Sequence, residues 1–217
     1  MVRPLKPKLS RPAIASAAIA AVDADGDFTI EQLASKLGVA ASSLYNHVSG
    51  RADIVELMRD ELFADTTNVP DLGSWELTLT AFVGRYRAAL GRHPRVIPLL
   101  IGNTLAGPTT TAFYQALATI LRHAGFDDAQ LLDAVTTVDV FALGAGLDLS
   151  TPEDMWRPER FPPGPMQDAL MAGTASPGRS DRAFDFGLAV MVAGLRETLA
   201  GRGPQAGRWD EVGTRHQ

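Results

Sequence analysis

A short stretch near the amino terminus gathers hydrogen-bonding side chains at consecutive positions. Ser42, Ser43, Tyr45, Asn46 and His47 alternate with apolar residues at helical spacing. Hydroxyl, amide and imidazole groups of this kind can bond to phosphate oxygens and to the edges of bases. The stretch therefore predicts a surface that reads a nucleic-acid groove.

The sequence offers little support for catalysis or metal binding. The chain has no cysteine, and His47 has no His or carboxylate partner at metal-ligand spacing. No serine or other nucleophile is paired with a base, and no strand precedes the Gly144-Ala145-Gly146 triplet to make it a phosphate loop. We expect no catalytic residues, no metal and no cofactor, and therefore no enzyme.

Two short helices must hold the polar stretch in place. Thr29 and Gln32 form a capping-box pattern that opens a helix to Leu37, and Gly38 can supply the left-handed turn that follows it. A second helix is expected over about 40–48. The apolar positions that would lock the two helices together are Leu33, Ala34, Leu37, Val39, Leu44 and Val48. The pattern predicts a helix-turn-helix whose second helix enters the major groove.

Flanking helices complete a small domain. Ser10 can cap a first helix with Pro12 in its opening turn, and Asp25-Gly26-Asp27 ends it. Gly50 begins a further helix with Asp53 near its positive end. We predict that residues 1–65 form a helix-turn-helix DNA-binding domain with a three-helix core.

One run of this domain resembles a known family. The residues Leu33-Ala34 … Leu37-Gly38-Val39 … Ser43-Leu44-Tyr45-Asn46-His47-Val48 … Arg51 … Asp53 are similar to the DNA-binding region of TetR-family regulators. The resemblance covers roughly residues 10–62; beyond residue 65 it rests on helix order only. It implies an all-α homodimer that binds a double-stranded DNA operator and carries a variable ligand-binding body.

The resemblance also implies roles for single residues. Thr29 and Arg51 would contact phosphate, and Tyr45 and His47 would bind the DNA backbone. The residues that would face bases are Ala41, Ser42 and Ser43. Two positions depart from the family pattern, since Glu31 stands where some relatives place a base-reading Arg and Ala41 replaces longer polar residues.

The composition agrees with a protein that touches DNA at one end only. The net charge is −5, but residues 1–11 hold four basic residues and no acid, whereas residues 65–217 hold 13 basic and 17 acidic residues. No window approaches the roughly 18 consecutive apolar residues that a membrane span needs, so we expect no membrane contact. The absence of cysteine favours a cytoplasmic location.

Residues 66–217 are predicted to form a larger helical ligand-binding and dimerisation domain. Helices are expected over about 75–91, 96–101, 108–123 and 127–147. Residues 151–180 carry six of the fourteen prolines and are expected to form loops with at most a short helix near 165–172. Ser180 would cap a last long helix that ends at Gly201. Strand signals are nearly absent, so the predicted fold class is all-α.

Aromatic and polar residues of this domain could line a cavity for a small, largely apolar effector. The candidate ligand-binding residues are Phe82, Tyr86, Asn103, Thr104, Phe113, Phe141 and Trp156. Aromatic walls with a few polar groups are typical of small-molecule pockets. Ordinary core packing explains each of these residues equally well.

Continuous apolar faces on the helices at 128–147 and 180–200 predict a four-helix homodimer interface, two helices from each chain. The leading hypothesis is a transcriptional regulator, in particular a repressor that a small effector releases from a palindromic operator. The alternative is a dimeric all-α scaffold or an enzyme without sequence-specific DNA binding.

Overall fold

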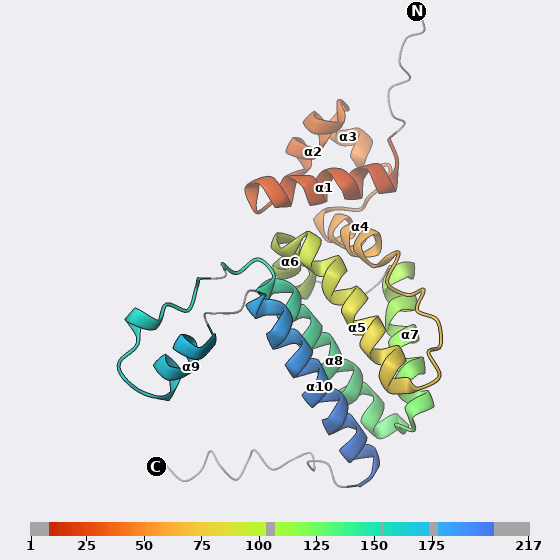
Figure 1. Ribbon diagram of the computed structural model, residues 1–217. Coiled ribbons are helices and arrows are strands. Elements are labelled where there is room, and N and C mark those ends of the chain that lie inside the picture. The colour runs from red at the N-terminus through yellow and green to blue at the C-terminus, as the bar shows by residue number, and fades with distance from the viewer. Residues whose placement is uncertain (1–8, 103–106, 153, 174–177, 202–217) are drawn as a thin grey trace, which may run out of the picture.

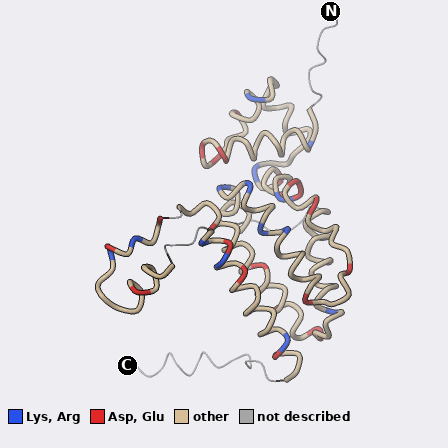
Figure 2. Tube along the Cα trace, in the orientation of Figure 1, with Lys and Arg blue, Asp and Glu red and all other residues tan. Residues whose placement is uncertain are grey.

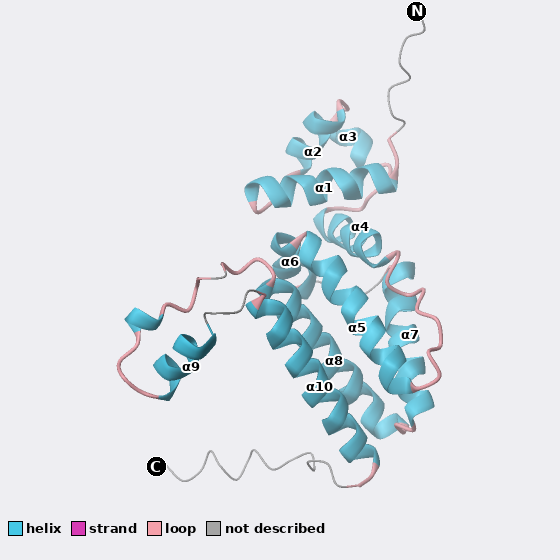
Figure 3. Ribbon diagram, in the orientation of Figure 1, coloured by secondary structure: helices cyan, strands magenta, loops and turns pink. Residues whose placement is uncertain are grey.

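The computed structural model describes residues 9–102, 107–152, 154–173 and 178–201. These residues form ten α-helices and two short 3₁₀ helices, and none of them lies in a strand (Figure 3). The prediction of an all-α fold is confirmed. A small head of helices stands on a larger helical body, and one helix lies between them (Figure 1).

The head begins as its local signals predict. Helix α1 (Arg11–Asp25) is capped by the side chain of Ser10 and ends at Gly26, whose φ is +81°. Helix α2 (Ile30–Leu37) has the full capping box between Thr29 and Gln32. Gly38 follows it in the left-handed conformation that the sharp turn requires.

Helix α3 (Ala41–Leu44) is shorter than the predicted range of about 40–48. After Leu44 the backbone tightens, because the N–H of His47 bonds to the Leu44 carbonyl at 2.8 Å, three residues back. The Val48 N–H bonds to the same carbonyl at 3.0 Å, so the chain still completes a helical turn. The predicted second helix is thus one α turn followed by a tighter turn.

Helix α4 (Arg51–Phe63) connects the head to the body (Figure 1). It packs against α1 on one side and against α5, α6 and α7 on the other. Nearly every residue from Ile54 to Phe63 is buried, so this helix has two covered faces rather than one. Any movement of α4 therefore disturbs its packing against α1 and against the helices of the body.

Between residues 75 and 148 the described part of the body consists of three long helices and two short ones, and the chain between them is broken at proline or glycine. They are α5 (Trp75–Arg92), the 3₁₀ helix η1 (Pro94–Val96), α6 (Ile97–Ile101), α7 (Pro108–Ala124) and α8 (Asp128–Asp148). Ser74 caps α5, Asp127 caps α8 and Gly125 ends α7, as the sequence predicts. Pro94 and Pro108 occupy first helical positions, where the missing N–H costs nothing.

The segment between α8 and α10, which is rich in proline, forms an arm that extends from the body (Figure 1). It holds the 3₁₀ helix η2 (Pro158–Arg160) and α9 (Pro165–Gly173), and it leads into α10 (Arg179–Leu199). The prediction that Ser180 caps α10 is wrong. Gly178 takes the cap position at φ +77°, and Ser180 is the second residue of the helix, where its buried hydroxyl accepts a bond from Arg87 at 3.0 Å.

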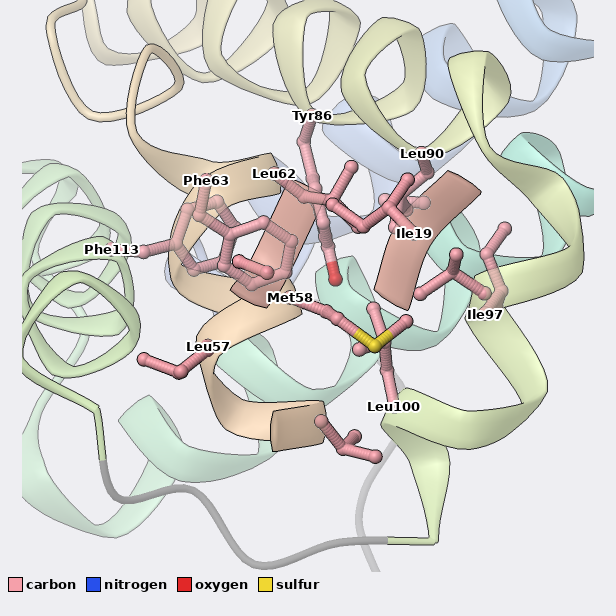
Figure 4. Packing of buried hydrophobic residues seen from close by; sticks show 14 of the residues in the cluster. Ile19, Leu57, Met58, Leu62, Phe63, Tyr86, Leu90, Ile97, Leu100 and Phe113 are labelled. Carbon is pink, nitrogen blue, oxygen red and sulfur yellow. The ribbon is translucent and has the colours of Figure 1, made fainter. Parts of the chain in front are cut away.

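One hydrophobic core runs through head and body without interruption. Figure 4 shows Met58 and Leu62 of α4 beside Ile19 of α1 and beside Leu90 and Ile97 of the body. The predicted domain boundary at residue 65 therefore follows the chain but does not divide the core. A change in the packing of the body reaches the head through these contacts.

Among the described residues, α8 alone is long and apolar enough to cross a membrane by length and composition. It packs against α5, α7 and α10, and 22% of its apolar window is buried. Part of its surface remains uncovered, since Leu132 is 71% exposed and Val140 63% exposed.

Candidate nucleic-acid interface and interior cavities

Helix α3 and the turn after it present the predicted contact residues at the surface. Ser42, Asn46 and Tyr45 are exposed, the last by 56%, while Ala41, Ser43 and His47 are half-buried. Leu44 and Val48 point inward and are buried. The structure therefore places all six polar or small side chains on one accessible segment, held by two buried anchors.

Thr29 lies at the amino-terminal end of α2. Its Oγ1 accepts the N–H of Gln32 at 3.1 Å, and its own N–H donates to Gln32 Oε1 at 2.7 Å. The side chain is exposed, so the hydroxyl hydrogen is free to donate outward. The positive end of the helix dipole adds to the attraction for a phosphate.

Arg51 is held by contacts within the head. Its guanidinium donates to the carbonyl of Phe28, pairs with the Asp27 carboxylate and lies 4.3 Å above the Phe28 ring. The hydrogen bond from Arg51 lowers the pKa of Asp27 below its ordinary value. The side chain is still 44% exposed. Arg51 thus fixes the turn between α1 and α2 against the start of α4, a role that the sequence did not reveal.

Arg11 is a second positioning residue that the sequence analysis missed. One of its nitrogens donates to the carbonyl of His47 at 2.8 Å, and the other pairs with Asp53 at 2.9 Å. The second oxygen of Asp53 accepts the N–H of Ser49 at 3.0 Å. These bonds fasten the turn that carries His47 to both α1 and α4. In the sequence, Arg11 was counted only among the four basic residues of residues 1–11.

Positive charge is sparse on the described part of the head. Lys and Arg lie at separate points rather than in one stripe (Figure 2). Arg11 and Arg51 are both paired with acids, which leaves Lys36 as the exposed cation without an ion pair in this region. Within residues 9–65, the groups at the surface that can contact DNA are therefore mainly hydroxyl, amide and backbone hydrogen-bonding groups. Arg3, Lys6 and Lys8 lie outside the described residues.

The body contacts the head directly where α5 ends. The Nδ1 of His93 lies 2.6 Å from Oδ2 of Asp23 in α1. Arg95 donates to the carbonyls of Asp23 and Ala24 at 2.8 and 3.0 Å. Arg95 thereby satisfies carbonyls in the last turn of α1, where a cation is also favoured by the dipole.

A cavity of about 290 Å³ lies in the body beside α4 and opens to the surface at the exposed Ile101 and Val140. Its polar residues are Arg59, Tyr86, Tyr114 and Asp139, from α4, α5, α7 and α8. Both phenols donate to Oδ1 of Asp139, Tyr86 at 2.8 Å and Tyr114 at 3.1 Å. Burial raises the pKa of each phenol, so both remain protonated donors. Burial also raises the pKa of Asp139, although the two phenol bonds act in the opposite direction.

Arg59 connects this cavity to the helices around it. The side chain is buried, pairs with Glu56 one turn earlier in α4 and donates to the carbonyl of Leu100 in α6. The other oxygen of Glu56 accepts the N–H of Gly107 at 2.6 Å. The wall that α4 contributes is thus tied to both ends of the α6–α7 connection.

A larger cavity of about 850 Å³ opens between α5, α7 and the segment before α5. Phe82 and Trp75 supply its aromatic surface, and Thr78, Gln115 and His123 supply polar groups. Phe113 separates it from the smaller cavity, because its ring centroid lies 4.9 Å from that of Phe82 and 4.6 Å from that of Tyr86.

The predicted ligand-binding residues are therefore not brought together. Phe82 lines the large cavity and Tyr86 the small one, while Phe113 is fully buried between them. Two of the predicted residues lie elsewhere. Phe141 stacks on Phe184 with centroids 5.7 Å apart, and Trp156 lies 40% exposed on the arm; neither lines either cavity. Asn103 and Thr104 lie outside the described residues.

Sequence reasoning missed Arg59, Tyr114 and Asp139. The available signal was Asp139 itself, an acid inside the apolar run Val138-Asp139-Val140-Phe141-Ala142. An acid at such a position needs hydrogen-bond partners, and tyrosines on neighbouring helices are suitable donors.

Comparison with known proteins identifies the fold. Residues 69–199 match the family described as "Tetracyclin repressor-like, C-terminal domain". The chain belongs to the TetR family. It is a DNA-binding transcriptional regulator and not an enzyme. The region matched is the body, for which the sequence analysis had helix order alone.

A match to one relative extends into the head. The HTH-type transcriptional repressor DrrR1 of Streptomyces coeruleorubidus is 26% identical over 222 residues, covering 91% of this chain and 81% of that protein. An HTH-type transcriptional regulator of Saccharopolyspora erythraea is 33% identical over 155 residues, covering 70% of this chain and 64% of that protein.

Solved structures show the same fold. The apo TetR-family protein ActR of Streptomyces coelicolor is 23% identical with a TM-score of 0.74, and the match covers 93% of this chain and 99% of that one. ActR in complex with actinorhodin is 22% identical with a TM-score of 0.72, covering 88% and 97%.

Proposed function

We propose that the protein is a cytoplasmic homodimeric repressor that a small, largely apolar effector releases from a palindromic operator. One observation carries this proposal: α4 packs against α1 of the head, and its Arg59 lines a cavity of the body. A ligand in that cavity contacts the helix that leads to the DNA-binding head. It shifts DNA affinity only if it prefers one arrangement of α4 to another.

In the proposed DNA complex, Ala41, Ser42 and Ser43 face base edges in the major groove. Thr29, Tyr45 and His47 contact the sugar-phosphate backbone. Arg51 reaches a phosphate with the exposed part of its guanidinium while it keeps its bond to Phe28. The exposure of Ser42 and Tyr45 and the buried anchor Leu44 support this arrangement.

The proposed dimer is formed by α8 and α10. The apolar stripe of α10 that the sequence singles out packs within the chain, since Phe184, Leu188 and Leu195 are buried. Another face remains uncovered: Phe186 is 74% and Val190 55% exposed. Together with the exposed Leu132 and Val140 of α8, this face supplies the apolar surface that a four-helix seam needs.

The proposed effector site is the pair of cavities separated by Phe113. The larger, at about 850 Å³, lies within the range of small-molecule sites, and the smaller supplies charged groups. ActR has the same fold and has been solved in complex with actinorhodin, which supports a ligand-binding body here. Of the predicted contact residues, Phe82 and Tyr86 remain in this proposal, and Phe113 forms the partition between the two cavities.

Fluorescence anisotropy on the DNA upstream of the protein's own and neighbouring genes tests the proposal. We expect saturable binding of two protomers to an inverted repeat, with half-sites about one helical turn or a multiple apart. A scrambled duplex of equal length serves as the control. Equal affinity for both duplexes would contradict the proposal and favour a scaffold without sequence-specific DNA binding.

A further inference from the structure

The two carboxylate oxygens of Asp139 in the small cavity differ in their hydrogen-bond partners. Both tyrosine hydroxyls donate to its Oδ1, and no described residue donates a hydrogen bond to its Oδ2. The carboxylate lies between α5 and α7 on a helix whose neighbouring side chains are apolar. One oxygen of a half-buried carboxylate thus remains available to a ligand.

The charges around the cavity do not cancel. Arg59 and Asp139 are the two charged residues among those that line it. The Arg59 guanidinium is paired with the carboxylate of Glu56, which lies on the same helix. The charge of Arg59 also acts on Asp139, so one cation faces two carboxylates, Glu56 and Asp139, and the site keeps one negative charge. Asp139 is half-buried, and a negative charge that is partly removed from water favours a partner of opposite sign.

The remaining walls suit an organic cation. Phe63, Tyr86 and Tyr114 present aromatic rings to the cavity, and Phe63 lies edge-on to Tyr86 with centroids 5.2 Å apart. Figure 4 shows the Tyr86 side chain beside the Phe63 and Phe113 rings, with its hydroxyl oxygen directed inward. Aromatic faces attract ammonium groups, most strongly where water is excluded.

We propose that the small cavity binds the ammonium group of an apolar amine, with the nitrogen paired to Oδ2 of Asp139. This inference rests on the proposed function, because it assigns the chemical class of the effector at the same site. The volume of about 290 Å³ admits an aromatic or aliphatic amine of modest size. A larger ligand extends past Phe113 into the neighbouring cavity.

Three probes of nearly equal shape test the assignment on the full-length protein. Phenethylammonium carries the cation, 2-phenylethanol is its neutral counterpart and phenylacetate its anionic one. We expect NMR titration to show at least tenfold tighter binding of phenethylammonium than of either other probe. Since this comparison uses the unmodified protein, it does not depend on the folding of any variant.

A pair of variants then locates the binding. Asp139→Asn should weaken phenethylammonium binding at least tenfold, whereas Asp133→Asn, an exposed carboxylate on the same helix, should leave it unchanged. Equal binding of the alcohol, preference for phenylacetate, or no binding of any probe would overturn the proposal. So would undiminished cation binding by folded Asp139→Asn.

The DNA-binding readout separates this inference from the function on which it rests. If the neutral or the anionic probe binds and releases DNA, the effector switch stands and the cationic assignment fails. If phenethylammonium binds as expected and DNA affinity does not change, the cation site stands and the switch fails.

Discussion

The imidazole of His93 and the carboxylate of Asp23 lie 2.6 Å apart, and this contact joins the end of α5 in the body to α1 in the head. Both side chains are about one-third exposed, at 31% and 35%. A contact of this exposure contributes less than about 1 kcal/mol to stability. Its consequence is geometric, because together with Arg95 it fixes the angle between head and body.

His93→Ala should therefore weaken operator binding several-fold while lowering the free energy of unfolding by less than about 1 kcal/mol. Without this contact the DNA-binding head is less fixed relative to the body. Fixing it when DNA binds costs free energy, and this cost lowers the affinity. Arg122→Ala, which removes an exposed ion pair with Asp128 in the body, is the matched control and should leave DNA affinity unchanged. Anisotropy titration and urea unfolding measure the two effects. Wild-type affinity in His93→Ala would show that the contact does not restrain the head.

Tyr45→Phe should weaken DNA binding by a similar factor on every sequence, because its exposed hydroxyl is proposed to contact the backbone and not a base. Stability should not change, since the ring is more than half exposed. Substitution of Ser42 should instead alter which base pairs are preferred. A Tyr45→Phe variant that changes sequence preference would place this residue against a base.

Arg51→Ala should have two separable effects. The loss of its bonds to Asp27 and Phe28 should reduce stability by up to about 1 kcal/mol, because the pair is partly exposed. The loss of a phosphate contact should also flatten the salt dependence by about one unit of log K per log salt concentration. An unchanged slope with reduced stability would leave Arg51 as a positioning residue only.

Phe186→Glu should separate the dimer, because it places a charge in the proposed α8–α10 seam at a cost of several kcal/mol. Met171→Glu, at an apolar position on α9 that is 64% exposed against 74% for Phe186, should leave the protein dimeric. Leu195 is unsuitable for this test, since it is buried within its own chain. Sedimentation at micromolar concentration distinguishes the outcomes, and a dimeric Phe186→Glu would show that other helices form the interface.

Binding of phenethylammonium should weaken as the pH falls toward about 4. The cation pairs with ionised Asp139, whose pKa burial raises above the ordinary 3.8. Protonation at a pH below the pKa therefore removes the partner charge. The two phenols that donate to Asp139 keep their protons over this range, because burial raises the pKa of Tyr86 and of Tyr114. Affinity that is constant from pH 7 to 4 would contradict the pairing.

The parts of the fold that could be predicted are those with local causes. The capping box of Thr29 and Gln32 and the left-handed Gly38 are fixed by residues within a turn of one another, and the structure has both. The cap at Ser180 failed because Gly178, two residues earlier, offers an unstrained left-handed start.

The parts that could not be predicted depend on contacts between distant segments. Phe82 and Tyr86 are one helical turn apart and looked like one wall, yet Phe113 of α7 lies between them and divides the space into two cavities. The bonds of Arg11 to His47 and of His93 to Asp23 join residues far apart in sequence. Helical periodicity carries no information about such pairs.

The central claim is that the cavity beside α4 and the DNA-binding head are energetically coupled. Linkage requires that a cavity ligand which weakens operator binding by some factor bind the operator complex more weakly by the same factor, about 5–150-fold for typical couplings. The deciding measurement is a titration of phenethylammonium into free protein and into the operator complex. We predict weaker binding to the complex, matched by an equal loss of DNA affinity; equal affinity for both forms would contradict the account.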